Sequence, residues 1–305
     1  MKRVVSVSLG TSKRDKTHTT TILGQEFTIE RRGTDGNRER FRELVRELDG
    51  KVDAIGVGGA DIWVATSKKR YAFRDVLSLV SHVQQSAVVD GSGLKQTLER
   101  ETITKLQVDG TVDFRNERAL MVSAVDRFGM AQALDRVCPD VLYGDFYFGL
   151  GIPLPIRSYR WVEILAGILL PVITQMPIQW FYPTGEKQEQ RTPKFPKIWE
   201  DRTFVCGDWH YIRRYAPDIL TGKTILTQTL RSADLAWLKS AGVSRAITTT
   251  PSMGGETFAT NVMEGVIVSL LEKPRTEITD SDYLDVLRQL DWKPNVIKMD
   301  SVSVD

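Results

Sequence analysis

Short apolar runs that are typical of buried strands alternate along the chain with segments whose apolar residues recur at helical spacing. The clearest case lies at residues 119–145. An apolar run at 119–125 predicts a strand buried on both faces. Apolar side chains three and four positions apart then predict a helix, and residues 141–143 predict a second strand. This order of strand, turn, helix and strand is the βαβ unit of parallel sheets.

The same alternation extends over the rest of the chain. Strands are predicted at 4–9, 52–57, 87–89, 203–206, 224–227 and 246–249, and helices at 41–48, 74–85, 94–106, 210–220, 233–240, 258–271 and 280–290. Two hairpins, at 19–30 and 62–73, interrupt the first part. The pattern predicts an α/β protein of two domains: residues 1–117 form a substrate-side domain with hairpins, and residues 118–305 form a Rossmann-like, doubly wound second domain.

Residues 161–182 are the most apolar part of the chain. Glu163, Pro171, Pro177 and Gln179 interrupt this stretch, so it contains no run of about 20 apolar residues that would span a bilayer. It is predicted to be a buried helix in a protein without a membrane partner. The polar segment 184–199, which contains three prolines, is predicted to be a surface excursion.

Charge and cysteine content narrow the function classes. The chain of 305 residues has 41 basic and 39 acidic residues, and the resulting net charge of +2 provides no general attraction to nucleic acid. Cys138 and Cys206 are too few for a disulfide framework, and the N-terminus has no apolar run typical of a signal peptide, so a cytoplasmic location is expected. The three histidines show no metal-ligand spacing, so no metal is expected.

The turn of the βαβ unit, residues 123–129, is a candidate cofactor site. Ser123 is small, and Gly129 permits a close approach of the backbone to a phosphate. Arg127 would offset the negative charge of Asp126 beside that phosphate. The alternative is a plain βαβ unit that binds no nucleotide.

Asp145 ends the second strand of this unit, 16 residues after Gly129, where an acid binds the ribose of NAD. A carboxylate there disfavours the 2′-phosphate of NADP. Thr249 and Pro251, at the exit of a later strand, would contact the nicotinamide or its ribose. These residues predict NAD or NADP as cofactor, with NAD favoured.

Two further strand ends carry charged residues. Asp90 and Lys95 lie on one strand-to-helix turn, and a lysine beside a carboxylate can exchange a proton with a hydroxyl group that is being oxidised. His210 would act as an acid or base, and Arg213 or Arg214 would bind a substrate carboxylate bidentately. Solvated helix termini are the alternative for both segments.

The chain resembles a bacterial family of predicted dehydrogenases, labelled quinate or shikimate 5-dehydrogenase-like, in the strings VVDGSGLKQTLER, MVSAVDRFGMAQAL, GDWHYIRRYAPD and TTTPSMGGETFATNVMEG. The resemblance spans nearly the whole chain. It implies a two-domain dehydrogenase-like fold and NAD(P)-dependent oxidation of a secondary alcohol, such as a cyclic hydroxy acid. The family's glycine-rich turn is replaced here by residues 124–129, and the T-D-G string at Thr34 lies too early in the chain to match the family's substrate-site aspartate.

The favoured function is therefore an NAD(P)-dependent oxidoreductase of a small-molecule substrate, with Lys95 and Asp90 as its acid–base pair. The alternative is a non-catalytic module that binds a small anionic metabolite. A reductase of an acyl or lipid substrate, suggested by the apolar stretch alone, is a third hypothesis. No nucleic-acid or membrane partner is expected, and formation of a homodimer is left open.

Overall fold

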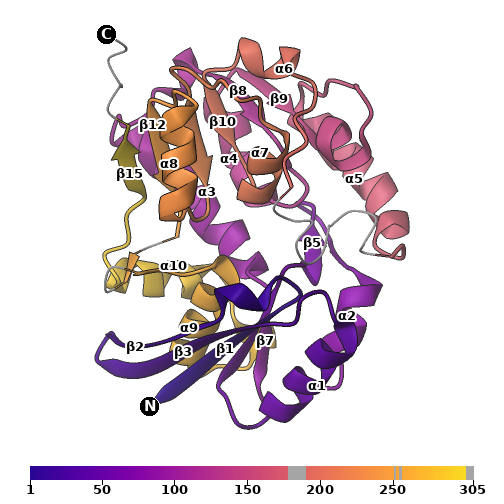
Figure 1. Cartoon of the computed structure of the whole chain (residues 1–305), viewed down its shortest axis with the longest axis vertical. Helices are drawn as coiled ribbons and strands as arrows, with labels where there is room; N and C mark the ends of the chain where they lie inside the picture. The colour runs from indigo at the N-terminus through magenta and orange to yellow at the C-terminus, as the bar shows by residue number, and fades with distance from the viewer. Residues whose placement is uncertain (178–189, 251, 254–255, 300–305) are drawn as a thin grey trace. The chain divides into compact units, whose positions relative to one another are not determined.

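The computed structural model describes residues 1–177, 190–250, 252–253 and 256–299 (Figure 1). The chain forms two compact units. Unit 1 consists of residues 1–97, 167–188 and 259–292, and unit 2 consists of residues 98–166, 189–258 and 293–305. Each unit has helices around a mainly parallel sheet, which confirms the predicted α/β class. The domain boundary at residue 117 stays a prediction.

Unit 1 is built on a five-stranded sheet in the order β2-β3-β1-β4-β7. Its strands are β1 (Lys2–Ser8), β2 (Lys16–Ile22), β3 (Gln25–Gly33), β4 (Ala54–Gly58) and β7 (Ala87–Val89). β2 is antiparallel to β3, and the other pairs are parallel. Val4, Val5 and Val7 of β1 are fully buried or nearly so, because the central strand of a parallel sheet is covered on both faces.

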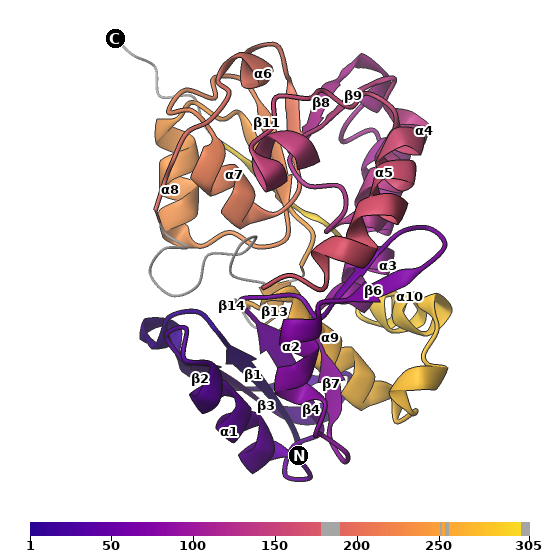
Figure 2. The same cartoon turned by 90° about the vertical axis from the view of Figure 1, so that its right-hand side faces the viewer.

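Helices cover both faces of this sheet. α9 (Thr260–Leu271) packs against β1, β4 and β7, whereas α1 (Arg38–Leu48) and α2 (Arg74–Val80) lie on the other face (Figure 2). Asn37 begins α1, because its side chain accepts a hydrogen bond from the amide of Arg40. The remaining elements are η1 (Ser12–Arg14), the second predicted hairpin formed by β5 (Trp63–Ala65) and β6 (Arg70–Ala72), η6 (Arg275–Glu277) and α10 (Asp280–Gln289).

Unit 2 contains a six-stranded sheet in the order β15-β12-β11-β10-β8-β9. Its strands are β8 (Arg118–Met121), β9 (Asp140–Tyr143), β10 (Phe204–Cys206), β11 (Thr224–Thr227), β12 (Arg245–Thr248) and β15 (Asn295–Lys298). β15 runs antiparallel to β12, and the other pairs are parallel. After β8 the chain adds β9 on one side and then β10, β11 and β12 on the other, so its winding reverses between β8 and β10. This order differs from the order 3-2-1-4-5-6 of dinucleotide-binding sheets.

Alternate residues of each strand face opposite layers of helices in unit 2. Ala119 and Met121 of β8 face a core formed with α3 (Ser92–Val108), α4 (Phe128–Val137) and the first part of α5 (Tyr159–Ile173). Leu120 and Val122 face the core formed with α6 (Lys197–Glu200), α7 (Trp209–Tyr215) and α8 (Ser232–Ser240) (Figure 2). The remaining elements are η2 (Phe114–Asn116), the π-helix η3 (Asp145–Leu150) and the antiparallel pair β13 (Ser252–Met253) and β14 (Glu256–Thr257).

The apolar stretch predicted to be a buried helix is buried along one face. α5 buries Val162, Ala166 and Leu170, but Trp161 and Ile168 are more than half exposed, at 58% and 64%. The prediction of a wholly buried helix is therefore wrong for α5. Residues 178–189, which the apolar stretch and the predicted surface excursion include in part, lie outside the described residues. Across the part of the chain that is described, no helix combines the length and the apolar character that crossing a bilayer requires.

Candidate functional site

The carboxyl ends of the strands bring charged side chains together within each unit. In unit 1, Lys95 Nζ lies 2.8 Å from Asp61 Oδ1, and both side chains are largely buried. Asp61 follows β4, and Lys95 lies near the start of α3, which follows β7. Because β4 and β7 are neighbouring parallel strands, their ends meet at one edge of the sheet. The structure therefore pairs Lys95 with Asp61, where the sequence predicted a pair with Asp90.

Asp90 organises the loops at the same edge. Its carboxylate accepts hydrogen bonds from the amides of Ile62 (2.8 Å), Trp63 (2.8 Å) and Ser92 (3.0 Å). These bonds join the segment after β4 to the start of α3. The described contacts of Asp90 are thus those of a loop-holding carboxylate, because its two oxygens are occupied by backbone donors.

Glu264 of α9 holds the turn that follows Asp90, and the sequence analysis missed it. Its carboxylate accepts hydrogen bonds from the amides of Gly91 (2.6 Å) and Gly93 (3.3 Å), from the Tyr283 hydroxyl (2.7 Å) and from Arg275 (2.9 Å). Burial raises the pKa of Glu264, although the charge of Arg275 opposes that rise. The sequence feature that could have indicated Glu264 is its position as the single glutamate among the apolar residues of α9.

Unit 2 carries a second charged group, here named the Arg127 cluster: Glu99, Asp126, Arg127 and Asp208. The Arg127 side chain is 1% exposed; its guanidinium donates to Glu99, lies 2.8 Å from Asp208 Oδ2 and 3.5 Å from Asp126 Oδ2. Burial alone would lower the pKa of Arg127, but the charges of Glu99, Asp126 and Asp208 raise it. Three carboxylates thus contact this one guanidinium.

The Arg127 cluster lies where the winding of the unit 2 sheet reverses, the position at which open α/β sheets bind ligands. Arg127 follows β8, and Asp208 follows β10. Gly207 permits the two strand ends to approach each other: its φ is 128°, and an added Cβ would lie 2.7 Å from Val122 Cγ2. A side chain at this position would therefore require the Val122 side chain to shift and would strain the backbone.

Ser123 adds a buried hydroxyl at this reversal point. Its backbone nitrogen lies 3.5 Å from the position of the Cβ that Gly207 lacks. Ser123 is 6% exposed, and no hydrogen-bond partner for its Oγ exists among the described residues. A buried hydroxyl without a partner is unfavourable by about 1–3 kcal/mol, so a polar ligand atom would be stabilised here. In the described part, Thr248 Oγ1 at the end of β12 is buried in the same way.

Two backbone amides of the turn predicted to bind a dinucleotide form hydrogen bonds within the βαβ unit itself. The Asp145 carboxylate accepts hydrogen bonds from the amides of Ala124 (2.9 Å) and Val125 (2.9 Å). Gly129 is buried in the first turn of α4. Two amides of the turn are thus bonded to a carboxylate of the same βαβ unit, and the assignment of residues 123–129 to a binding site stays a prediction.

Asp145 predicts a pH dependence of stability. Desolvation raises the pKa of its carboxyl from the ordinary 3.8 to about 6, against the opposing effect of the two amides. Because the folded state binds the proton more tightly, the contribution of Asp145 to stability is present below about pH 4 and is lost as the pH rises through about 6, by about 3 kcal/mol in total. Asp145→Asn should lack this contribution, so the difference in stability between wild type and variant should shrink or reverse with rising pH when urea unfolding is measured at intervals of pH. A difference that stays constant from about pH 4 to about pH 7 would contradict the assignment.

Of the other predicted residues of unit 2, His210 meets the Arg127 cluster through its backbone amide. Asp208 begins α7 by accepting hydrogen bonds from the amides of His210 (2.8 Å) and Tyr211, and the His210 side chain is exposed. Arg213 lies over the Trp237 ring, and Arg214 over Tyr215. Thr249 is buried at the exit of β12, and Pro251 lies outside the described residues.

No group of three or more histidine, cysteine, aspartate or glutamate side chains that could hold a metal ion occurs among the residues that the structure describes. Cys138 and Cys206 are both buried and unpaired with each other.

Family comparisons identify two domains along the chain. The model described as "Domain of unknown function (DUF8754)" matches residues 93–299, and "Domain of unknown function (DUF8753)" matches residues 3–90. A search of curated proteins found no match.

Solved structures with a similar course of the chain include binding proteins of transporters. An ABC transporter periplasmic solute binding protein from Actinobacillus succinogenes with bound D-allose is 9% identical, with coverage of 99% of both chains and a TM-score of 0.36. A solute binding protein from Burkholderia multivorans is 10% identical, covering 97% of this chain and 99% of that chain, with a TM-score of 0.39. A periplasmic ribose ABC transporter protein from Conexibacter woesei is 10% identical, covering 99% and 93%, with a TM-score of 0.39. TM-scores below 0.5 carry no conclusion about what this chain binds.

These findings correct the functional predictions. The resemblance to quinate or shikimate dehydrogenases is not retained: the matching families are described without an activity, and the solved structures reported above are named as binding proteins. The predictions of an enzyme, of oxidoreductase chemistry and of NAD or NADP rested on that resemblance and on the turn at 123–129, whose Ala124 and Val125 amides bond to Asp145, and they are not retained either. The predicted cytoplasmic location finds no support in these comparisons, in which two of the structures are named periplasmic.

Proposed function

Because the chain belongs to the family described as "Domain of unknown function (DUF8754)", which names no activity, we propose a function from the residues themselves: a non-catalytic module that binds a small hydroxylated molecule. The binding site is the Arg127 cluster together with Ser123. The ligand carries no net negative charge. A neutral sugar or polyol has this chemistry.

The observation that supports this proposal is the unpartnered, buried Ser123 hydroxyl beside Gly207 at the reversal point of the sheet. A ligand hydroxyl can both donate and accept, so it can satisfy Ser123 Oγ and a carboxylate of the Arg127 cluster at once. The Asp208 side chain is 15% exposed, so it is the member of the cluster that a ligand can reach. Arg127 holds Asp208 in place with a bond of 2.8 Å.

Charge decides between a neutral and an anionic ligand. Glu99, Asp126 and Asp208 surround one guanidinium, and their like charges would repel a carboxylate or phosphate in a poorly solvated site. This favours a neutral ligand over the small anionic metabolite of the sequence-based alternative. The order β9-β8-β10-β11-β12 supports ligand binding at the β8–β10 reversal, but not the glycine-rich contact that a dinucleotide requires.

The test is a thermal-shift and calorimetric screen of the whole chain. Neutral aldoses and polyols, including D-ribose, D-allose and D-galactose, form one panel, and quinate and shikimate form the anionic panel. A neutral ligand at about 100 times its Kd should stabilise the protein by about 2.7 kcal/mol. Binding confined to the anionic panel, or to neither panel, would contradict the proposal.

Ser123→Ala gives the sharpest control of this assignment. It should weaken binding of the identified ligand about tenfold, because one hydrogen bond is lost, and leave the stability of the free protein unchanged or higher. Ser244→Ala is the matched variant: Ser244 donates to the Gly222 and Lys223 carbonyls at the start of β12, so its loss should lower stability without changing affinity. Equal affinity of wild type and Ser123→Ala would remove Ser123 from the site.

A further inference from the structure

Two arginines share one tryptophan ring in unit 2. Arg213 Cζ lies 4.3 Å and Arg191 Cζ lies 4.8 Å from the centroid of the Trp237 ring. The Trp209 ring meets Trp237 edge-on, with centroids 6.0 Å apart. We name Arg191, Arg213 and Trp237 the Trp237 patch. None of its residues belongs to the Arg127 cluster.

The two arginines differ in how their charge is balanced. Arg191 Nη1 lies 2.5 Å from Asp218 Oδ1, and its other nitrogens donate to the carbonyls of Arg213 (3.4 Å) and Ala216 (3.0 Å). In contrast, no carboxylate among the described residues forms an ion pair with Arg213. Arg213 Nη1 is buried and donates to no described acceptor.

The nearest carboxylate on α8 is already engaged. Asp234 accepts two hydrogen bonds from the Arg231 guanidinium and a third from the Arg231 amide. Desolvation, and then the charges of Arg191 and Arg231, lower the pKa of Arg213. A ring contact alone contributes about 0.5–2 kcal/mol to a cation and leaves its N–H groups unpaired. The buried Nη1 of Arg213 therefore remains a donor that an anion would satisfy.

We propose that the Trp237 patch is an anion site in which Arg213 binds the phosphate group of a small molecule. Arg213 Nη1 supplies the buried donor, and the guanidinium face that rests on Trp237 is held in a fixed orientation. A guanidinium matches phosphate oxygens in geometry, and Arg213 has the one charge of the patch that no described carboxylate pairs. This site is separate from the proposed site for a neutral ligand and takes a ligand of the opposite charge.

The first experiment titrates the whole chain with inorganic phosphate and follows tryptophan fluorescence and heat release. Sodium chloride holds the ionic strength constant, because exposed charges respond to salt alone. Phosphate should change the fluorescence with saturation, sulfate should compete with it, and acetate should not. A phosphate ester, glycerol 3-phosphate, tests whether the group is bound free or as part of a molecule: tighter binding of the ester supports the proposal. No saturable response to phosphate or its ester in the wild type would overturn the site, and equal binding of acetate would overturn the assignment to phosphate.

Variants separate an anion site from a structural stack. Arg213→Gln should weaken phosphate binding at least tenfold and leave the protein as stable or more stable in phosphate-free buffer. Arg157→Gln removes the same charge from an exposed position of unit 2 and should bind phosphate as the wild type does. If Arg213 has a structural role alone, Arg213→Gln will lose stability equally with and without phosphate, which would contradict the proposal. Arg213→Lys, which keeps the charge but lacks the planar donor set, should bind with intermediate affinity.

Discussion

Arg127→Met is expected to destabilise unit 2 by about 3–5 kcal/mol, because removing one partner of a buried ion pair leaves the other charge buried and uncompensated. Here the loss leaves Glu99 fully buried without its guanidinium, and it also frees Asp208 from a bond of 2.8 Å. Urea unfolding followed by the fluorescence of the unit 2 tryptophans measures the change in midpoint and slope.

Two variants make this expectation specific. Glu99→Gln introduced into Arg127→Met should recover part of the lost stability, because the buried charge is removed along with its partner. Arg118→Gln is the matched control: its nearest carboxylate, Asp201, is 3.9 Å away and both side chains are about half exposed, so a change below about 1 kcal/mol is expected. A loss of similar size in Arg127→Met and Arg118→Gln would show that Arg127 does not hold the cluster.

Glu264→Leu is expected to destabilise unit 1 by about 3–5 kcal/mol. The substitution removes the acceptor shared by the Gly91 and Gly93 amides, the Tyr283 hydroxyl and Arg275. Leucine has no atom that can accept these donors, and each unsatisfied buried donor is unfavourable by about 1–3 kcal/mol. The measurement is again urea unfolding, with hydrogen exchange of the Gly91 and Gly93 amides as the local readout.

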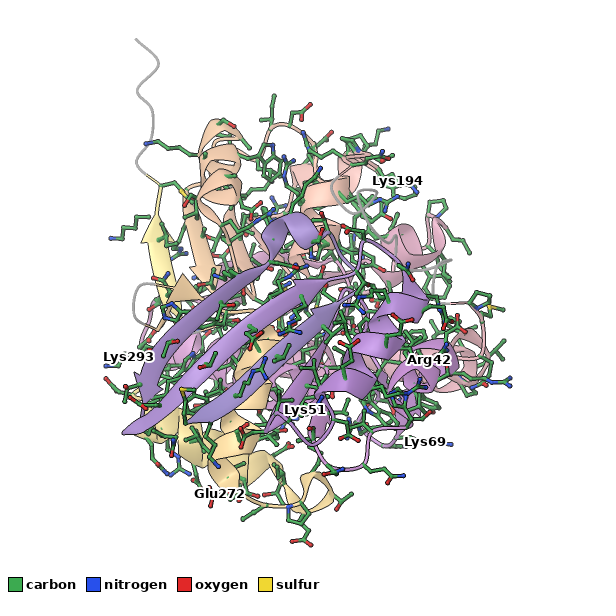
Figure 3. All side chains as sticks on the ribbon, turned by 60° about the horizontal axis from the view of Figure 1, so that its bottom comes forward. Arg42, Lys51, Lys69, Lys194, Glu272 and Lys293 are labelled. Atoms are coloured by element: carbon green, nitrogen blue, oxygen red, sulfur yellow. The ribbon has the colours of Figure 1, made fainter. Side chains whose placement is uncertain are left out.

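The control for this variant is a glutamate at the end of the same helix. Glu272, labelled in Figure 3, is 72% exposed in its side chain and forms an ion pair with Lys2 at 2.6 Å. Glu272→Leu should change stability by less than about 1 kcal/mol, since exposed ion pairs contribute little. Faster exchange of the Gly91 amide in Glu264→Leu but not in Glu272→Leu would confirm that Glu264 holds this turn. Unchanged exchange in both would contradict it.

Secondary structure followed closely from the local pattern. The predicted strand at 224–227 coincides with β11, and the strand at 246–249 differs from β12 by one residue. The helix predicted at 41–48 lies within α1. Such elements are readable because the spacing of apolar residues and the capping side chains act over three or four positions of the chain. The burial of α5 differed from the prediction, because the helix has more apolar residues than its one buried face contains.

The sequence predicted which charged residues lie at the strand ends, but it did not predict the partners of their side chains. Asp90, Lys95, Arg127 and Asp145 were recognised as polar residues after strands, and the structure places each of them there. Their partners were misjudged: Lys95 pairs with Asp61, 34 residues away, and Asp145 bonds to the amides of its own βαβ turn. The position of Asp145 after a strand correctly indicated that its carboxylate lies at the end of the sheet. It did not indicate that this carboxylate binds backbone amides instead of a ligand.

The amino-acid pattern thus contains the α/β class, the order of elements and the polar character of the strand ends, because these depend on neighbours along the chain. The strand order of each sheet decided which charges meet. It brings Arg127 beside Glu99 and Asp208, 28 and 81 residues away, and it brings Glu264 to Gly91 across 173 residues. The charge balance of a site depends on distance and burial in space, both of which arise only when the sheets assemble. The neutral ligand proposed above therefore rests on the tertiary structure and could not be proposed from the sequence pattern.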